Sequence, residues 1–358
     1  MTVRLYDLAY NARQKPNNPH WPPGNRPSLA GPSFGLHMSE SEGDGVGRCL
    51  AVLVGGRAGG HEAAVFHAAW HPTADLIATC GMDRTVKIWR MPQIDHAKVK
   101  IDSEHLARED KPLFSTDLIH NARVLSIAWL TDDTLVSYSG PALMGNPATE
   151  NFWKETGTVA IWTWLGFDRY LPRGMLAPMM RGNQTDYQNS KSFKLISVYT
   201  LPMSNPTLHF YTPFYKVHDP LILMPSGDSI RIFNIVHFKP RPTPPAPRDP
   251  REAAIEASDR NTNNLVAHAD RITIGDDAVA DDELDGNEND ALQPGVVAEE
   301  STLKKLCESV KSHILTLNHQ QGSHTLSTVE RCEVAFGGNI ILGVGKGGTL
   351  FIWRLKSR

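Results

Sequence analysis

The chain has 358 residues, a length that suits either one large all-β domain or two smaller domains. Its net charge of −3 excludes a global positive field, so we expect no direct sequence-specific binding of nucleic acid. The 28 glycines and 25 prolines favour turns over a helical bundle. The apolar runs are too short for a membrane span, and the N-terminus has no apolar signal region. The four cysteines form no CxxC pair, which fits a reducing nuclear or cytosolic compartment.

Residues 2–8 (TVRLYDL) predict a short strand at the start of the chain. Residues 9–48 follow, with many Pro, Gly, Asn and Ser and no hydrophobic period. A second segment of this kind, 239–301, begins with KPRPTPPAPRDPR and then turns acidic. Such compositions bury too little apolar surface to offset chain entropy, so we expect both segments to be disordered insertions.

Residues 60–91 (GHEAAVFHAAWHPTADLIATCGMDRTVKIWRM) predict three short strands joined by a turn and a tight turn. The segment resembles a WD repeat, in which one four-stranded propeller blade is built from each copy. In that family a His, a Ser or Thr, an Asp and a Trp form a hydrogen-bonded tetrad within the blade. The matching residues here are His61, Thr79, Asp83 and Trp89.

Further copies of the pattern are degraded. Residues 119–164 offer His120, Ser137 and Trp162, but an insertion at about 140–156 replaces the tight turn and its Asp. The place of the blade Trp is taken by Tyr6, Trp162, Phe233 and Trp353 in the remaining copies. Successive blade Trp positions lie further apart in sequence than the roughly 40–45 residues of one blade, so each interval between them carries an insertion.

The predicted fold is therefore an all-β WD-repeat propeller, incomplete at about four of seven blades, with exposed apolar faces on its first and last blades. We expect the long insertion to follow the third strand of its blade and the chain to resume with the outer strand. The predicted division is a third strand (1–8), an insertion (9–48), a WD blade (49–92), two degenerate blades (93–170 and 171–238), a Pro-rich and then acidic insertion (239–301) and a C-terminal blade (302–358).

Neighbouring residues narrow the resemblance. The runs VGGRAGGHEAAV (54–65), ATCGMDRTVKIWRM (78–91) and KPLFSTDLIHNARVLSIAWL (111–130) resemble the EED, or extra sex combs, family of Polycomb proteins, as does segment 314–355. The resemblance implies a nuclear, non-catalytic scaffold of Polycomb repressive complex 2 without cofactor or metal. Its implied partners are the SET-domain histone methyltransferase subunit and a histone tail carrying trimethyl-lysine.

Trimethyl-lysine is read by aromatic rings that surround the quaternary ammonium. The family's Trp-Tyr pair at this cage corresponds here to His209 and Phe210, a possible remnant of the cage. Because His209 departs from Trp, only Phe210 keeps an aromatic face. Ordinary packing between blades is the alternative interpretation of Phe210.

Other functional readings have weaker support. The run GVGKGGT (343–349) lacks the P-loop spacing and precedes a strand, which indicates a hairpin turn. The pair of His61 and Asp83 resembles part of a hydrolase triad, but in a blade it is structural. Two alternatives stay open: a generic WD interaction scaffold, such as a ubiquitin-ligase or trafficking adaptor, and a truncated gene-model product with no independent activity.

Overall fold

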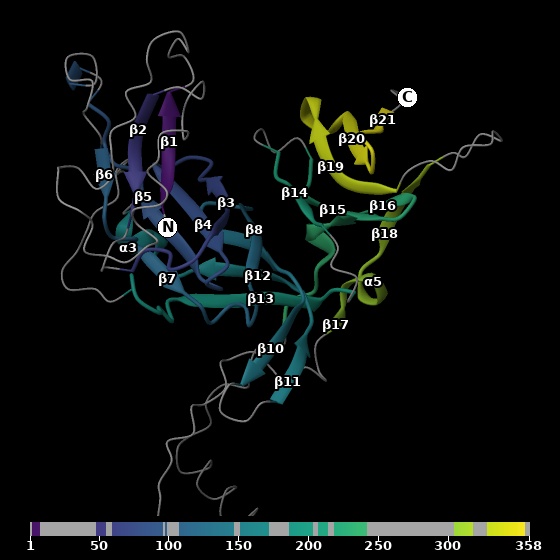
Figure 1. Ribbon diagram of the computed structural model, residues 1–358, viewed down its shortest axis with the longest axis horizontal. Coiled ribbons are helices and arrows are strands. Elements are labelled where there is room, and N and C mark those ends of the chain that lie inside the picture. Colours follow the sequence, from purple (N-terminus) through teal and green to yellow (C-terminus); the bar gives the residue numbers. More distant parts are fainter. Residues whose placement is uncertain are drawn as a thin grey trace, which may run out of the picture. The chain divides into compact units, whose positions relative to one another are not determined.

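The computed structural model describes residues 2–7, 48–54, 59–95, 97–98, 107–146, 151–171, 186–202, 207–213, 218–241, 304–317 and 328–354. These residues are mostly β-strand, and the strands belong to one unit made of Met1–Pro240 and Gly295–Arg358 (Figure 1). The predicted all-β fold is confirmed. The predicted insertions 9–48 and 239–301 lie almost wholly outside the described residues, so their disorder stays a prediction. Within the described ranges, no helix is long and apolar enough to cross a membrane.

The N-terminal sheet has the strand order β1-β2-β6, comprising β1 (Val3–Asp7), β2 (Arg48–Leu53) and β6 (Ala107–Glu109). Strand β1 pairs with β2 in antiparallel fashion, and Tyr6 packs against the buried side chains of β2. The segment 49–92, predicted as one blade, therefore spans two sheets. Leu53 joins them, because it packs against Ile77 and Trp89 of the next sheet.

The next sheet, which we call the Asp83 sheet, has the order β3-β4-β5-β7. Its strands are β3 (Val65–Trp70), β4 (Leu76–Gly81), β5 (Val86–Arg90) and β7 (Phe114–Thr116). All six residues of β4 are buried, since both faces of this strand are covered. The exposed face of β3 carries Phe66 and Trp70, which are 43% and 57% accessible.

The Thr158 sheet has the order β17-β13-β12-β9-β8. It contains β8 (Val124–Trp129), β9 (Thr134–Ser139), β12 (Thr158–Trp164), β13 (Phe193–Thr200) and the short parallel strand β17 (Lys304–Lys305). Its fourth strand β13 lies beyond the limit of residue 170 predicted for this blade. The predicted insertion is a hairpin of β10 (Ala142–Asn146) and β11 (Asn151–Glu155), and α3 (Phe167–Tyr170) follows β12.

The Phe233 sheet has the order β14-β15-β16-β18. It consists of β14 (His209–Tyr211), β15 (Leu221–Ser226), β16 (Ser229–Asn234) and β18 (Ser312–Thr316). The chain leaves this sheet after β16 through η1 (Ile235–His237) and returns through α5 (Leu306–Ser309) to β18, which is the outer strand. Part of the segment 302–358, predicted as one blade, thus completes the preceding sheet.

The C-terminal sheet contains β19 (Val329–Ala335), β20 (Ile340–Gly345) and β21 (Leu350–Arg354), with η3 (Phe336–Gly338) between the first two strands. Leu350 and Ile352 of β21 are more than half accessible. These side chains, with Phe66 and Trp70 of β3, are exposed as expected for the first and last blades. Residues 49–54 of the predicted first blade, which were expected to be exposed too, are buried, and β1 pairs with their strand.

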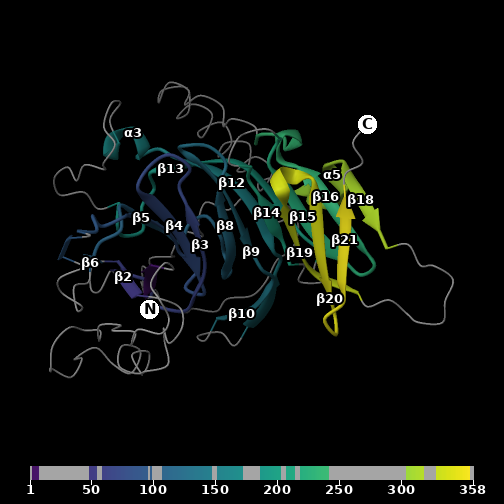
Figure 2. The same cartoon turned by 90° about the horizontal axis from the view of Figure 1, so that it is seen from above.

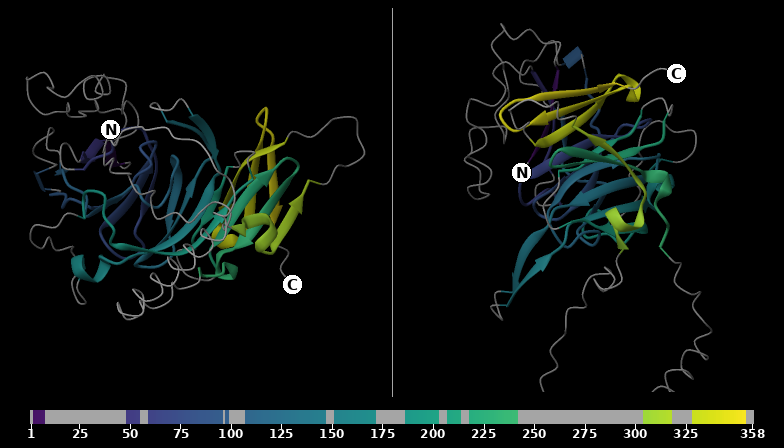
Figure 3. Two further views of the ribbon diagram at one scale, coloured as in Figure 1. Left: turned by 90° about the horizontal axis from the view of Figure 1, so that it is seen from below. Right: turned by 90° about the vertical axis from the view of Figure 1, so that its right-hand side faces the viewer.

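Three apolar clusters join neighbouring sheets, which follow one another in chain order in Figures 2 and 3. Phe114, Trp162 and Trp164 lie in the cluster between the Asp83 and Thr158 sheets. Tyr199 and Phe233 lie in the cluster between the Thr158 and Phe233 sheets. A third, smaller cluster joins the Phe233 and C-terminal sheets. Burial of such rings is the main stabilising contribution in each interface.

Candidate functional site

The structure brings His61, Thr79, Asp83 and Trp89 together inside the Asp83 sheet. Trp89 Nε1 lies 2.8 Å from Thr79 Oγ1, which lies 2.8 Å from His61 Nε2. His61 Nδ1 lies 2.9 Å from one carboxylate oxygen of Asp83. The Asp83 carboxylate can only accept, so His61 Nδ1–H donates to it. With the ring neutral, His61 Nε2 accepts from the Thr79 hydroxyl, whose oxygen accepts the indole N–H of Trp89.

Asp83 is the end point of this set because it accepts from four donors. Besides His61 Nδ1, these are the backbone N–H groups of Glu62 and Thr85 and the hydroxyl of Thr85. Burial alone would raise the pKa of Asp83, but the hydrogen bonds from His61, Thr85 and Glu62 outweigh it and hold the pKa well below its usual range. Burial lowers the pKa of His61 despite its carboxylate partner. The set is therefore a neutral imidazole bonded to an ionised carboxylate.

The order Asp83, His61, Thr79 is also that of a hydrolase triad, with Thr79 in the position of the nucleophile. The surroundings of Thr79 do not suit that role. Its side chain is completely buried, and its oxygen already accepts the indole N–H of Trp89. A nucleophile must be reachable by its substrate. The geometry of these four residues is that of an internal hydrogen-bond set.

A second set occupies the Thr158 sheet, and sequence reasoning found only part of it. Trp162 Nε1 donates to Ser137 Oγ at 3.0 Å, and Ser137 Oγ lies 2.7 Å from His120 Nε2. His120 Nδ1 lies 2.9 Å from Thr158 Oγ1, where the other sheet has a carboxylate. His120 is fully enclosed, and burial lowers its pKa to about 3.

Thr158 could have been found from the sequence. The runs TVKIW (85–89) and TVAIW (158–162) align, which places Thr158 at the position of Thr85. Thr85 Oγ1 itself lies 3.2 Å from His61 Nδ1. When the tight turn with its Asp is replaced by the β10–β11 hairpin, the threonine remains to bond the histidine.

Lys87 and Ser115 form a further buried pair that sequence reasoning missed. Lys87 Nζ lies 2.6 Å from Ser115 Oγ, and both residues are less than 5% exposed. Burial lowers the pKa of Lys87 to about 8, although the Asp83 and Glu62 carboxylates favour its charge. Ser115 belongs to the FST run that the sequence singled out, and the pair links its strand β7 to β5.

The remaining blade Trp positions differ in burial. Phe233 is completely buried in the cluster between two sheets, as Trp162 is. Trp353 is partly buried in the smaller C-terminal cluster, beside Phe351. Tyr6 is partly buried against β2. In these three places the ring serves packing, because no histidine set is recorded beside it in the described parts of the chain.

The structure does not bring His209 and Phe210 together as walls of one cage. Adjacent residues of a strand point to opposite faces, and both lie in β14. Phe210 is buried in the cluster between the Thr158 and Phe233 sheets, as the packing alternative expected. A cage wall must be open to the ammonium ion. The methyl-lysine role stays a prediction, and the placement of Phe210 weighs against it.

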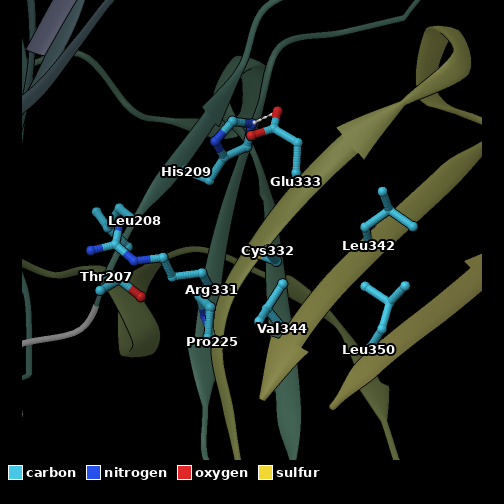
Figure 4. Close-up of a pocket in the computed structure, with 10 residues that line it drawn as sticks. All are labelled: Thr207, Leu208, His209, Pro225, Arg331, Cys332, Glu333, Leu342, Val344 and Leu350. Carbon is cyan, nitrogen blue, oxygen red and sulfur yellow. Dashed lines mark ion pairs between the residues drawn. The ribbon is translucent and has the colours of Figure 1, made fainter. Parts of the chain in front are cut away.

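His209 instead lines a pocket of about 280 Å³ between the Phe233 and C-terminal sheets (Figure 4). Its Nε2 atom lies 2.8 Å from Glu333 Oε1. Burial lowers the pKa of His209 although the Glu333 carboxylate favours its charge. Arg331 and the apolar residues Leu342 and Val344 complete the walls shown in Figure 4. Apart from the imidazole, no aromatic ring lines this described pocket.

Comparisons with known proteins support the WD assignment. Residues 47–90 match the family model "WD domain, G-beta repeat". F-box-like/WD repeat-containing protein TBL1Y of Homo sapiens and TBL1X of Mus musculus are each 32% identical over 105 residues. That stretch is 28% of this chain and 18% of either relative. The chain thus spans less than a fifth of the length of these relatives.

Two of the solved structures that match this chain are a polycomb complex and a WD40 domain. The Chaetomium thermophilum polycomb repressive complex 2 matches with a TM-score of 0.46 at 14% identity, covering 86% of this chain and 65% of that chain. The C-terminal WD40 domain of Sif2 matches with a TM-score of 0.36 at 10% identity, covering 86% of this chain and 49% of that chain.

The fold, the His61 set and the family match together define the class. The chain carries a WD repeat within an all-β fold of propeller-type blades, as the sequence predicted for residues 60–91. Among the described residues, no group of three or more His, Cys, Asp or Glu side chains is placed to hold a metal ion.

Proposed function

We propose that this chain is a non-catalytic scaffold whose blades present binding surfaces to other proteins. The observation that carries this proposal is the use of three buried titratable groups. His61, Asp83 and His120 all close internal hydrogen-bond sets within sheets, so they stabilise blades. Catalytic acids and bases must instead contact a substrate.

The particular complex that we propose is a nuclear histone methyltransferase assembly of the Polycomb repressive complex 2 type. Support comes from the runs that resemble the EED family, above all residues 111–130. In the structure this FST..IH run contributes Ser115 to the bond with Lys87 and His120 to the second histidine set. The proposed partners are the SET-domain methyltransferase subunit and the histone tail.

A second candidate is favoured by the curated relatives. The TBL1 proteins are described as F-box-like and WD repeat-containing, and they share 32% identity with part of this chain. A generic WD adaptor of that kind would use the same scaffold with other partners.

Affinity purification of the tagged full chain from its own cells, followed by mass spectrometry, distinguishes the two candidates. We expect a SET-domain methyltransferase in stoichiometric amount. Direct binding of the purified subunit should then follow in vitro, and a hydrogen-bond variant that still folds, such as Thr158→Ser, should bind equally well. Recovery of ubiquitin-ligase components without any methyltransferase would contradict the Polycomb proposal and favour the second candidate.

A further inference from the structure

We infer that a pocket between the Phe233 and C-terminal sheets is a binding site for an acidic peptide segment that carries a large apolar side chain. The pocket has a volume of about 560 Å³, within the roughly 300–1,000 Å³ typical of ligand sites. It is separate from the pocket of His209, with which it shares no lining residue. The inference goes beyond the proposed scaffold role, because it assigns one surface and the chemistry of its ligand.

The walls of this pocket are apolar. Ile232 and Leu315 come from the Phe233 sheet, and Ile341 and Trp353 come from the C-terminal sheet. The strand register places these side chains together, because residues directly opposite in antiparallel strands share a face of the sheet. Ile341 lies opposite Trp353. Leu315 lies opposite Ile230, and Ile230 is on the same face of β16 as Ile232. These walls suit a buried aliphatic or aromatic side chain.

The rim of the pocket is basic. His237, Lys311, His313 and Arg354 all line it, and none of the twelve lining residues is acidic. Within the described ranges, no ion pair is recorded for any of the four. The carboxylate of Asp219 contacts the lining residue Asn234 at 2.6 Å but does not itself line the pocket. Lysine and arginine side chains that have no acidic partner attract carboxylates most effectively at low salt.

The edge of the C-terminal sheet indicates that the ligand is an extended peptide. In the other three blade-type sheets a fourth strand pairs with the third: β7 with β5, β13 with β12 and β18 with β16. In the C-terminal sheet, no described strand pairs with the free edge of β21. Residues of β18 and of β21 line the pocket, so a strand added at the edge of β21 would lie beside it. A free strand edge offers backbone hydrogen bonds to an added strand.

These features together select one ligand. An extended segment can pair its backbone with β21, place an apolar side chain against Trp353 and Ile341, and bring flanking carboxylates to Lys311 and Arg354. A polyanion without an apolar group would leave the walls uncovered. An uncharged apolar segment would leave the basic rim without partners.

The test uses the full chain and a fluorescein-labelled peptide with a central Leu flanked on each side by three Glu residues. Binding is followed by fluorescence anisotropy at low salt. We expect saturable binding that weakens as salt is added, and weaker binding of matched peptides with Gln for every Glu or Ser for the Leu. No detectable binding of the Glu peptide, or equal binding of the Gln peptide, would overturn the inference.

Charge reversal of the rim tests the location of the site. The double variant Lys311→Glu with Arg354→Glu should weaken binding of the Glu peptide by about tenfold or more. Both side chains are exposed, so the melting temperature should change little. The matched control is Lys346→Glu, an exposed lysine of the same sheet that does not line the pocket. It should leave binding within about twofold.

Two results would overturn the location or the ligand class. One is an equal loss of binding in Lys346→Glu and in the double variant, which would show attraction by net charge alone. The other is stronger binding of a uridine oligonucleotide than of the Glu peptide, with the same dependence on Lys311 and Arg354. That second result would mark the rim as a nucleic-acid surface.

Discussion

The Asp83 sheet and the Thr158 sheet contain the same donor chain but end it on different acceptors. In both, an indole N–H donates to a hydroxyl, and the same hydroxyl bonds a histidine Nε2. The chain then ends on the Asp83 carboxylate in one sheet and on the Thr158 hydroxyl in the other. The comparison shows that these two histidine sets satisfy their buried donors with either a carboxylate or a hydroxyl, so a charge is not required.

The two acceptors nevertheless bind different numbers of groups. Asp83 accepts four hydrogen bonds, of which the one from the Thr85 backbone lies within the tight turn and the one from the Glu62 backbone ties the segment after His61 to that turn. Thr158 bonds His120 and Ser139 only. The hairpin β10–β11 supplies backbone pairing where the Asp83 sheet has its tight turn. Loss of the carboxylate is thus accompanied by a different connection between the second and third strands.

The largest expected effect is the loss of stability on Asp83→Ala. This change leaves the donors of His61, Glu62 and Thr85 without their acceptor, so we expect a loss of about 2–4 kcal/mol. Thr158→Ala should cost less, about 1–2 kcal/mol, because one histidine donor loses its partner. Urea denaturation at neutral pH measures both.

Asp75→Ala serves as the control for Asp83→Ala. Asp75 is exposed in the turn before β4, so its loss should change stability by less than about 0.5 kcal/mol. Equal costs for Asp83→Ala and Thr158→Ala would contradict the view that the carboxylate carries the additional bonds.

The next effect concerns the hydroxyl that lies between the indole and the imidazole, which is Thr79 in one sheet and Ser137 in the other. Thr79→Val and Ser137→Ala each leave an indole N–H and a histidine nitrogen unpaired in a buried place. We expect a similar loss of about 2 kcal/mol in each variant. Thermal or urea unfolding of the two proteins side by side measures it. Costs that differ by much more than about 1 kcal/mol would break the equivalence of the two sets.

A graded effect is expected from pH, and its size depends on how far the pH falls. Burial holds the folded-state pKa values of His61 and His120 below the usual histidine value of about 6.5. Between the folded value and 6.5, the unfolded chain binds a proton that the folded chain does not. Stability is therefore fully present above about pH 6.5 and declines as pH falls, by up to about 1.4 kcal/mol per pH unit for each histidine. For His120 the decline continues to about pH 3.

Thr158→Asp sharpens this prediction, since it gives the Thr158 sheet the carboxylate of the other sheet. A negative charge beside His120 favours the imidazolium, so the pKa of His120 should rise and the acid decline should become shallower. Urea midpoints at several pH values between 7 and 4 measure the change. A steeper decline in Thr158→Asp than in the unmodified chain would contradict the account.

The smallest effect is expected for trimethyl-lysine. With Phe210 buried and only the ring of His209 beside its pocket, a cation–π contact contributes about 0.5–1 kcal/mol. Millimolar affinity already requires about 4 kcal/mol. Calorimetry with a trimethyl-lysine histone peptide should therefore detect no binding below about millimolar concentration, and His209→Ala should change nothing. Low-micromolar binding would show that a cage exists elsewhere.

The difference between the two sheets also explains what the sequence could predict. The His61 set follows from residue types at fixed spacing, because a standard tight turn sets the distances along the chain. Thr158 was missed since the insertion breaks the spacing to His120, although the TVAIW run preserves the spacing to Trp162. Spacing patterns thus predict sets within short connections only.

Long-range pairing was harder to predict for the same reason. Strand β2 lies directly before the WD segment in sequence but pairs with β1, and its place is decided by packing of Leu53 against Ile77 and Trp89. The cage prediction for His209 and Phe210 carried over family positions without the alternation of β14. The bond between Lys87 and Ser115 spans 28 residues and has no sequence pattern.

The most direct test is the protonation of the two histidine rings. Long-range proton–nitrogen NMR of the imidazoles at pH 7 distinguishes the tautomers. The account predicts neutral rings protonated at Nδ1 and unprotonated at Nε2 for both His61 and His120, because Asp83 can only accept from His61 and we expect His120 to donate in the same way to Thr158. A proton on Nε2 of either ring, or an imidazolium at His120, would contradict the shared donor chain.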